Sequence, residues 1–439
     1  YTRVDFNRRT GNNYFGSGSS ARGAYAFGFG GGMGAGGGFS AYSGQDTFGN
    51  RLQTGVGISA AFVQWGGLTA GRIQSFFDFY ADNDTWFGST DSDVLTQALA
   101  YTYTFGNGFS ATLSIEDPAE RHKNPVAGLS VGAIGGIDPT TAIAGYSTIY
   151  PFALSPFAAA ALAAGGINYT QRENVPDVVG VLRVDQGWGS AQVSGAYHRI
   201  STSGSTIVNL TPATGGGFVV NALVPTVSGG YGQVGDNAWA VQGGVKINLP
   251  MLAAGDTLYA QAAYSKGNLS YANSGFPSTF QGSANSIGGT TFATYDAVVG
   301  PTGNLTMTPA YSALIALTHY WTPTLRSSLV LGGEWIKYSG AIRTAAGYAA
   351  GAACPTCLAT VTVNGAPYNP YSPFYNGGVQ YNASGNLIWS PVKDLDIGVE
   401  VVYYRNQMQH KEYDVNKANG RVISSDDGWD ARLRISRDF

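Results

Sequence analysis

The segment Leu95–Phe105 reads LTQALAYTYTF and separates large from small side chains by alternation. One set comprises Leu95, Leu99, Tyr101, Tyr103 and Phe105, and the other comprises Thr96, Ala98, Ala100, Thr102 and Thr104. Because successive side chains of a strand point to opposite faces, the segment predicts a strand with one large apolar face and one small, mostly polar face. Its length of about ten residues is what a tilted strand needs to cross a bilayer.

The same pattern recurs along the chain. After the turn Gly106–Gly108 the alternation resumes at Phe109, which predicts a hairpin. The strands predicted from Leu95 onward are Leu95–Phe105, Phe109–Ile115, Val178–Asp185, Ala191–His198, Trp239–Ile247, Thr257–Tyr264, Tyr311–Tyr320, Leu325–Tyr338, Val379–Trp389, Leu395–Tyr404 and Trp429–Phe439.

The N-terminal region has a weaker pattern around the glycine-rich run Gly28–Gly38. Its candidate strands are Tyr1–Arg8, Arg22–Phe29, Arg51–Ala60, Phe62–Trp65 and Leu68–Ser75. The total is about sixteen strands, an even number of the kind that closed bacterial barrels have.

The connections between these strands are alternately short and long. The long ones are Pro118–Pro176, Ser201–Asp236, Gly267–Thr308, Ser339–Gly377 and Asn406–Asp427. Brief turns on one side and long loops on the other are typical of outer-membrane barrels. The sequence therefore predicts an all-β fold: one transmembrane antiparallel β-barrel over residues 1–439, with the long connections on the external side.

Composition supports this prediction and excludes other classes. Charged residues make up only 12% of the chain, aromatic residues make up 13%, and the net charge is -3. This charge offers no basic surface for nucleic acid, and no apolar run reaches the roughly 18 residues of a membrane-spanning helix. A soluble β-sandwich would expose Lys and Glu on its polar face, whereas here that face carries mainly Thr, Ser, Gln, Asn and Gly.

The C-terminal segment Trp429–Phe439 alternates in the same way and ends on an aromatic residue. A terminal Phe439 on such a strand resembles the signal by which barrel-assembly machinery recognises outer-membrane proteins. The opposite face carries Asp430, Arg432 and Arg434, which suits a water-filled lumen.

Several segments resemble the alphaproteobacterial general porin family, an outer-membrane family of Gram-negative bacteria. They are Leu68–Asp78 (LTAGRIQSFFD), Asp177–Tyr197, His319–Arg326 (HYWTPTLR) and Asn386–Glu400 (NLIWSPVKDLDIGVE). The resemblance implies a sixteen-stranded barrel, a homotrimer in contact with the lipid bilayer and lipopolysaccharide, and passive diffusion of small hydrophilic solutes and ions. It also implies a loop folded into the pore between the fifth and sixth strands, which here is Phe76–Asp93.

That connection contains acidic residues and no Lys or Arg. They are Asp78, Asp82, Asp84, Asp91 and Asp93, and they predict a negative surface at the pore constriction. Rings of charge in a pore determine ion preference, so a positive wall is expected opposite. Its candidates are Arg3, Arg22, Arg51, Arg72, Arg432 and Arg434, with Arg183 and Arg326 as weaker choices.

The sequence contains no recognisable motif of a metal site or an enzyme active site. Cys354 and Cys357 predict a local loop disulfide, and the segment Asp82–Gly88 lacks the oxygen ligand and glycine of a calcium loop. His122, His198, His319 and His410 lie in no hydrolase or metalloprotease motif. We expect no metal, no cofactor and no enzymatic activity.

Two further functions remain open on the sequence. A substrate-specific channel, for example for saccharides, would line its path with a continuous series of aromatic side chains. Most Trp residues fall on the apolar face instead, which favours a general pore. An adhesin or receptor role would depend on the long loops.

Overall fold

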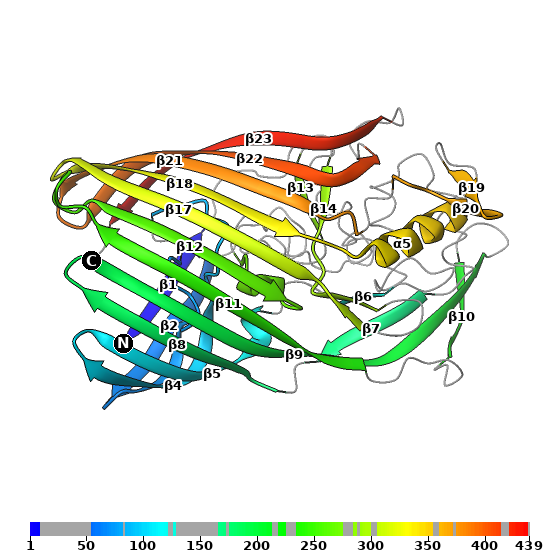
Figure 1. Cartoon of the computed structure of the whole chain (residues 1–439), viewed down its shortest axis with the longest axis horizontal. Coiled ribbons are helices and arrows are strands. Elements are labelled where there is room, and N and C mark those ends of the chain that lie inside the picture. The colour runs from blue at the N-terminus through cyan, green and yellow to red at the C-terminus, as the bar shows by residue number, and fades with distance from the viewer. Residues whose placement is uncertain are drawn as a thin grey trace.

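The structure, a computed structural model, describes residues 1–8, 54–81, 84–121, 126–128, 166–172, 175–212, 218–224, 234–274, 284–287, 290–299, 305–353, 360–371, 375–413 and 421–437. These residues form one large sheet of 16 strands, all antiparallel (Figure 1). From edge to edge the strands are β1 (Thr2–Arg8), β2 (Thr54–Trp65), β3 (Leu68–Gln74), β4 (Leu95–Gly106), β5 (Phe109–Glu116), β8 (Asp177–Gln186), β9 (Gly189–Pro212), β11 (Val234–Asn248), β12 (Thr257–Lys266), β17 (Pro309–Thr322), β18 (Leu325–Ile336), β21 (Gly378–Val392), β22 (Leu395–Tyr413) and β23 (Val422–Arg437). The strands β7 (Gly166–Arg172) and β10 (Phe218–Val224) pair with the far part of β9.

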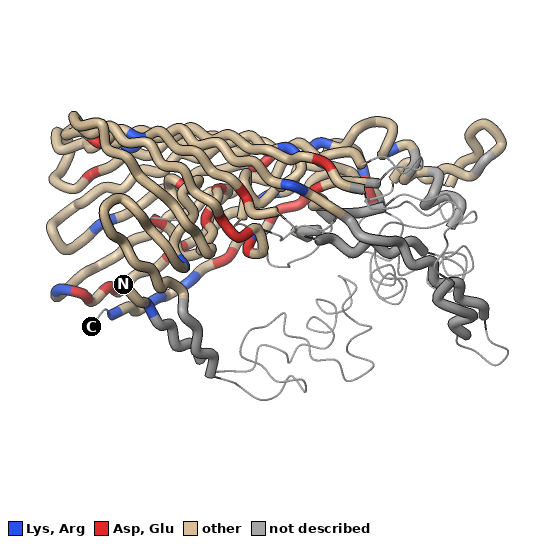
Figure 2. The backbone as a smooth tube through the Cα atoms, turned by 90° about the horizontal axis from the view of Figure 1, so that it is seen from below, with Lys and Arg blue, Asp and Glu red and all other residues tan. Residues whose placement is uncertain are grey.

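The sheet curves into a barrel wall whose described edges are β1 and β23. Short turns and both termini lie at one end, on the left of Figure 1, and the long connections lie at the other. Figure 2 shows the same placement of the termini from below, with charged positions distributed along the strands. The described part contains no helix that is both long and apolar enough to span a membrane.

Small elements occupy the long connections. They are η1 (Pro118–Arg121), β6 (Val126–Gly128), η2 (Leu269–Tyr271), β13 (Ala284–Ile287), β14 (Thr290–Ala293), β15 (Ala297–Val299), β16 (Leu305–Met307), α5 (Gly340–Ala353), β19 (Val361–Val363) and β20 (Ala366–Tyr368).

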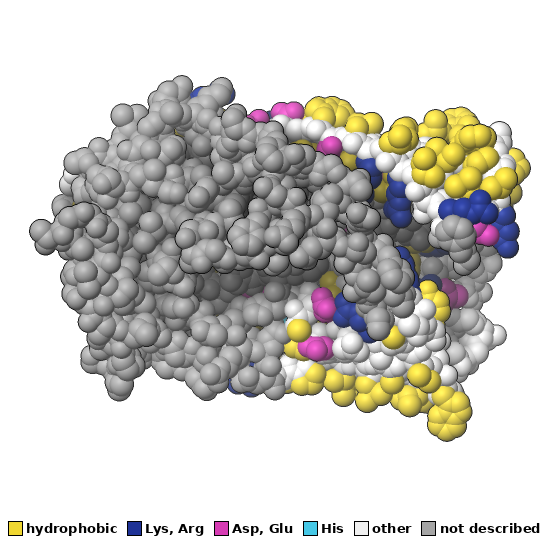
Figure 3. Space-filling view, turned by 180° about the vertical axis from the view of Figure 1, so that it is seen from behind, with side chains coloured by type: hydrophobic (Ala, Val, Ile, Leu, Met, Phe, Trp, Pro, Cys, Tyr) yellow, Lys and Arg dark blue, Asp and Glu magenta, His cyan; other side chains and the backbone are white. Residues whose placement is uncertain are grey.

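Alternation along each strand produces two chemically different faces. Leu99, Leu113 and Leu182 point outward with exposed fractions of 52%, 62% and 63%. The inward positions are polar and include Gln192, Ser194, Gln242, Gln261, Ser312, Ser328, Gln380, Asn382, Ser384 and Asn386. Figure 3 shows hydrophobic side chains on the outer surface and charged side chains around the hollow that opens toward the viewer. An apolar exterior and a polar interior are typical of a water-filled membrane barrel.

An aromatic girdle runs across five neighbouring strands near the end with the long connections. It consists of Trp239, Tyr264, Tyr311, Trp335 and Tyr381. Ring centroids lie 5.0 Å apart for Trp239 and Tyr264, 4.8 Å for Tyr264 and Tyr311, and 6.3 Å for Trp335 and Tyr381. Because Trp and Tyr prefer the membrane–water interface, the girdle marks one boundary of the hydrocarbon layer.

All eleven strands predicted from Leu95 onward are present among the described residues, although β18 ends at Ile336, two residues before the predicted end at Tyr338. Several N-terminal predictions need correction. Arg51–Ala60 and Phe62–Trp65 are not separate strands, because Ala61 pairs with both Thr2 and Arg72 inside the continuous β2. Small side chains there weaken the alternation without interrupting backbone pairing. Arg22–Phe29, Cys354, Cys357 and Phe439 lie outside the described residues.

The boundaries of the long connections also differ from the prediction. β9 continues to Pro212 and β22 to Tyr413, so the strands extend into two of the predicted loops. The fourteen-residue helix α5 lies inside a third. Strand residues beyond the membrane need no apolar face, and so their sequence lacks the alternation that revealed the rest.

Candidate functional site

The connection between β3 and β4, Ser75–Val94, lies inside the barrel and is called the inner loop below; its residues 82 and 83 lie outside the described part. The first residues of the inner loop contact β9 and β11, in the middle of the sheet. Gln192 Nε2 donates to the carbonyl oxygens of Phe76, Phe77 and Asp78 at 3.3, 3.3 and 3.1 Å. Gln242 Nε2 and Ser194 Oγ also donate to Phe77 O, at 2.9 and 2.7 Å.

Further contacts follow the wall around the lumen. The Tyr80 amide donates to Gln261 Oε1 on β12 at 3.0 Å. On β21, Asn386 Nδ2 donates to Asp84 O at 2.7 Å, and Asn382 Oδ1 accepts from Thr90 Oγ1 at 3.1 Å. Lumen-facing side chains of four different strands therefore hold the backbone and side chains of the inner loop.

The far part of the inner loop reaches the last two strands. The Trp86 amide donates to Glu400 Oε2 on β22 at 2.8 Å, and the Arg432 guanidinium on β23 donates to Trp86 O. Arg432 also lies over the Phe87 ring, 4.2 Å from its centroid, and Arg434 lies over the Trp86 ring at 5.5 Å. The contacts of the inner loop with lumen-facing residues thus continue from β9 to β23.

Three lumen-facing glycines accommodate side chains of the inner loop. A Cβ added at Gly244 on β11 would lie 2.3 Å from Phe79 Cδ1, and one at Gly332 on β18 would lie 2.1 Å from Thr90 Oγ1. At Gly398 on β22 it would lie 2.7 Å from the Trp86 ring. Absence of a side chain at these positions lets the inner loop pack directly on the wall.

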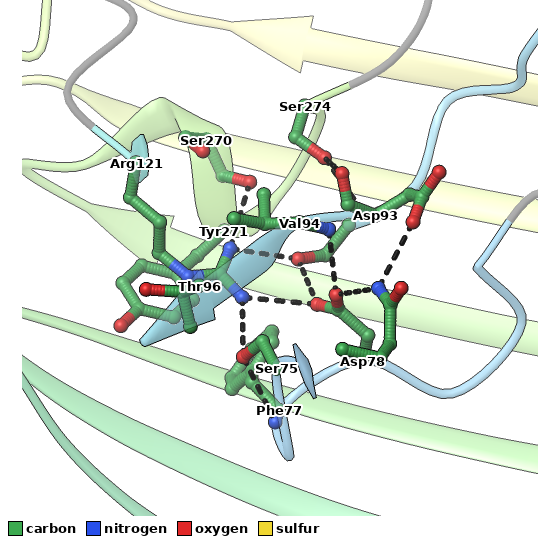
Figure 4. A network of polar contacts seen from close by, with 12 residues as sticks. Ser75, Phe77, Asp78, Asp93, Val94, Thr96, Arg121, Ser270, Tyr271 and Ser274 are labelled. Atoms are coloured by element: carbon green, nitrogen blue, oxygen red, sulfur yellow. Dashed lines mark hydrogen bonds and ion pairs between the residues drawn. The ribbon is translucent and has the colours of Figure 1, made fainter. Parts of the chain in front are cut away.

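Arg121, from η1, holds the base of the inner loop (Figure 4). Its side chain is 1% exposed and forms an ion pair with Asp78 at 3.0 Å. It donates to Ser75 Oγ at 2.7 Å and to Ser92 Oγ at 2.9 Å, and it lies 3.9 Å from the centroid of the Tyr271 ring. Burial opposes this charge, yet the Asp78 carboxylate, with Tyr271 and Glu116 nearby, holds the pKa of Arg121 above its ordinary value.

The Asp78 carboxylate joins the two ends of the inner loop. It accepts from the Val94 amide at 2.8 Å and from Ser92 Oγ. Tyr271 is fixed in turn, because its hydroxyl donates to Asp177 Oδ2 at 2.6 Å and the other oxygen of that carboxylate contacts His198 Nδ1. We call the group Arg121, Asp78, Tyr271, Asp177 and His198 the base network.

The structure changes the roles predicted for the acidic residues. Asp78 and Asp91 are buried, so they do not present negative charge to the pore, and that prediction is wrong for these two. Their carboxylates are used within the protein, Asp78 by Arg121 and Asp91 by Ser89 Oγ. Asp84 and Asp93 are partly exposed and stay candidates, while Asp82 lies outside the described residues.

The basic residues also divide into two groups. Arg432 and Arg434, predicted for the wall opposite the loop, lie in contact with the inner loop itself, and Arg3 shares the inward face of Ala60. The prediction that Arg72 belongs to the pore wall is wrong. Arg72 pairs with Gln97, on the outward face of β4 that carries Leu99, and forms an ion pair with Glu120 at 2.8 Å. Arg22 and Arg51 lie outside the described residues.

The weaker candidates face inward but have acidic partners. Arg183 forms an ion pair with Asp185 at 2.8 Å, and Arg326 forms one with Asp396 at 2.6 Å. Two further basic residues, Arg121 and Lys246, were not predicted. The Lys246 ammonium lies 5.2 Å from the centroid of the inward-facing Tyr259 ring. The inward alternation of β11 could have indicated Lys246, but nothing in the local sequence indicates Arg121.

Comparison with known proteins identifies the family. The model of a porin subfamily matches residues 1–430. The chain belongs to the porin subfamily. This porin is 27% identical to the porin Omp2b of Brucella suis over 221 residues, 47% of this chain and 49% of that protein. It is 28% identical to the Brucella neotomae porin Omp2b over 214 residues, so the chain spans about half the length of the curated relatives that it matches.

Among solved structures, the chain is similar to the outer membrane channel DcaP of Acinetobacter baumannii. Its TM-score is 0.49 at 13% identity, covering 89% of this chain and 77% of that one. Family membership confirms the resemblance to alphaproteobacterial general porins. The porin is an outer-membrane β-barrel of a Gram-negative bacterium.

Proposed function

We propose that this porin forms a water-filled pore for passive diffusion of small hydrophilic solutes and ions, and that the inner loop sets its size limit. The observation that carries the proposal is the attachment of the inner loop to lumen-facing residues from β9 to β23. A polar wall with a fixed constriction admits hydrated solutes and excludes those wider than the remaining opening.

The distribution of tryptophan favours a general pore over a substrate-specific channel. Of the eight tryptophans, seven are exposed on the outer face or in turns: Trp65, Trp188, Trp239, Trp321, Trp335, Trp389 and Trp429. Trp86 is the exception, and it contacts Arg432 and Gly398 of the wall. The buried aromatic residues of the inner loop, Phe77 and Tyr80, likewise pack against other side chains.

Liposome swelling tests the proposal. Vesicles that contain the purified protein are exposed to pentoses, hexoses, disaccharides and trisaccharides, and the swelling rate is measured for each. We expect the rate to fall smoothly with solute size and to be similar for isomers of equal size. Rapid entry of one disaccharide, with slow entry of its isomers, would instead support a saccharide-specific channel.

Removal of the basic side chains beside the inner loop should shift ion selectivity. The double variant R432Q/R434Q loses two positive charges from the lumen face. A unit charge at 4 Å in water contributes about 1 kcal/mol, so we expect the cation-to-anion permeability ratio to rise about two- to fivefold. The measurement is the reversal potential under a KCl gradient.

The matched control for this prediction is K266Q, which removes one positive charge from the outward face of β12 opposite Trp239. It should leave the reversal potential unchanged. An unchanged reversal potential in R432Q/R434Q would mean that these charges do not face the conducting path.

The proposed function also includes a homotrimeric assembly and no catalysis. We infer a homotrimer in contact with lipopolysaccharide from the family resemblance, and light scattering of the detergent complex measures the number of chains.

His198 forms a His–Asp pair with Asp177, but it is buried and its Nε2 has no hydrogen-bond partner among the described residues. A catalytic triad would place a nucleophile there, so this pair supports a structural role.

A further inference from the structure

A pocket of about 620 Å³ lies among the long connections, where the end of β18, the start of α5 and the extension of β22 meet. Figure 1 shows α5 beside these strand ends, at the end of the barrel away from both termini. Small-molecule sites range over roughly 300 to 1,000 Å³. The pocket is therefore large enough for a sugar with one or two charged substituents.

The pocket is strongly basic. Its lining includes Lys337, Arg343, His410 and Lys411, and none of its described lining residues is Asp or Glu. No side-chain hydrogen bond or ion pair joins these four residues to other described residues. By contrast, Arg72, Arg121, Arg183 and Arg326 elsewhere in the barrel all pair with carboxylates. The positive charge of the pocket is thus left without compensation within the described chain.

The surroundings of the Arg343 guanidinium favour binding of an anion in the pocket. Burial lowers the pKa of its guanidinium, and the nearby Tyr368 acts in the opposite direction. A bound anion would stabilise the charged form of a partly buried guanidinium. The helix α5 adds to the attraction, because it begins at Gly340 in the pocket lining and the start of a helix carries partial positive charge.

Aromatic rings supply the second element of the pocket. Tyr338, Tyr368 and Tyr371 are all in its lining. Tyr338 is buried in a hydrophobic cluster, and its hydroxyl accepts from the Tyr295 amide at 2.9 Å. The rings that a ligand can reach are therefore those of Tyr368 and Tyr371, which are partly exposed. Aromatic rings with polar ends offer an apolar surface and hydrogen-bonding groups together. This combination fits the faces and hydroxyls of a sugar ring.

The position of the pocket relative to the membrane is also defined. Lys337 follows Trp335 of the aromatic girdle by two residues, which is about 7 Å along a strand. The girdle marks the membrane–water interface. The pocket therefore lies just outside the hydrocarbon layer, at the height of lipid headgroups and within reach of external solutes.

From these observations we propose that the pocket binds a phosphorylated saccharide, with Arg343, Lys337 and Lys411 holding the phosphate and with Tyr368 and Tyr371 contacting the sugar. The chemistry is shared by the sugar phosphates of outer-leaflet glycolipids and by free sugar phosphates. The site is separate from the inner loop and does not depend on the proposed pore function.

The test uses isothermal titration of the detergent-purified full chain with two probes. Glucose 6-phosphate represents a free solute, and a lipopolysaccharide with a short phosphorylated core represents the membrane source. Glucose serves as the uncharged reference. The variants are R343Q and K411Q, alone and combined, with K411R to preserve charge and K393Q as a control in a turn at the opposite end of the barrel.

Loss of one charged hydrogen-bonding group should weaken binding of the phosphorylated probes about tenfold. We expect R343Q and K411Q each to have this effect, the double variant to bind still more weakly, and K411R and K393Q to bind like wild type. Preferential binding of lipopolysaccharide would assign the site to the membrane lipid, and preferential binding of glucose 6-phosphate would assign it to a solute. Equal binding by wild type and the double variant for both probes would overturn the proposal, as would equal binding of glucose.

Discussion

The variant R121M is expected to give larger and more variable single-channel conductance than wild type, together with a lower unfolding temperature in detergent. Methionine fills similar space but leaves Asp78 buried without its cation and removes the donors to Ser75 and Ser92. Breaking a buried ion pair by removing one partner costs about 3–5 kcal/mol. Because Asp78 joins both ends of the inner loop, this loss should release the loop from the wall.

A second variant distinguishes the effect of the unpaired Asp78 carboxylate from the effect of the lost guanidinium contacts. The double variant D78N/R121M lacks the unpaired buried carboxylate, so it should be more stable than R121M while the inner loop still lacks its guanidinium contacts. Unfolding temperature and single-channel conductance are measured for all three proteins. If R121M matched wild type in both, the base network would have no role in fixing the inner loop.

The variant G244V is expected to displace the inner loop through steric conflict. A Cβ at this position would lie 2.3, 2.8 and 3.0 Å from three atoms of the Phe79 ring. Overpacking of this kind costs about 1–3 kcal/mol, and the strain falls where the inner loop meets the wall. We expect a lower unfolding temperature and an altered conductance.

The adjacent glycine provides a matched control. Gly243 points to the outer face, and a Cβ added there would meet nothing within 4 Å. G243V therefore introduces the same side chain into the same strand without touching the inner loop. Equal effects of G243V and G244V would show that the result arises from strand properties and not from contact with Phe79.

The strands could be predicted from sequence because the signal for each is local. In Leu95–Phe105 and its partner strand, every second side chain faces lipid, so Leu99 and Leu113 alternate with small residues whatever the rest of the chain does. The inner loop was expected from the family resemblance alone. β7, β10 and α5 were missed because they lie beyond the membrane, where alternation is not required.

The base network could not be predicted, because it depends on contacts between residues far apart in sequence. Arg121 lies 43 positions from Asp78 and 149 positions from Ser270, and its local sequence indicates only a loop. Arg72 was misplaced for a related reason. Its charge suggested the lumen, whereas pairing with Gln97 places it outside, where Glu120 neutralises it.

If the inner loop narrows a passive pore, a variant with a shortened loop should conduct more than wild type. The segment from Tyr80 to Thr90 is replaced by a short Gly-Ser linker, which the geometry permits because Asp78 already contacts Ser92 and Val94. Single-channel conductance in KCl is recorded for both proteins with polyethylene glycols of increasing size. We expect ohmic steps from wild type, and severalfold larger steps with a larger polymer cutoff from the variant. Equal conductance and equal cutoff in the two proteins would mean that the inner loop does not limit passage through the pore.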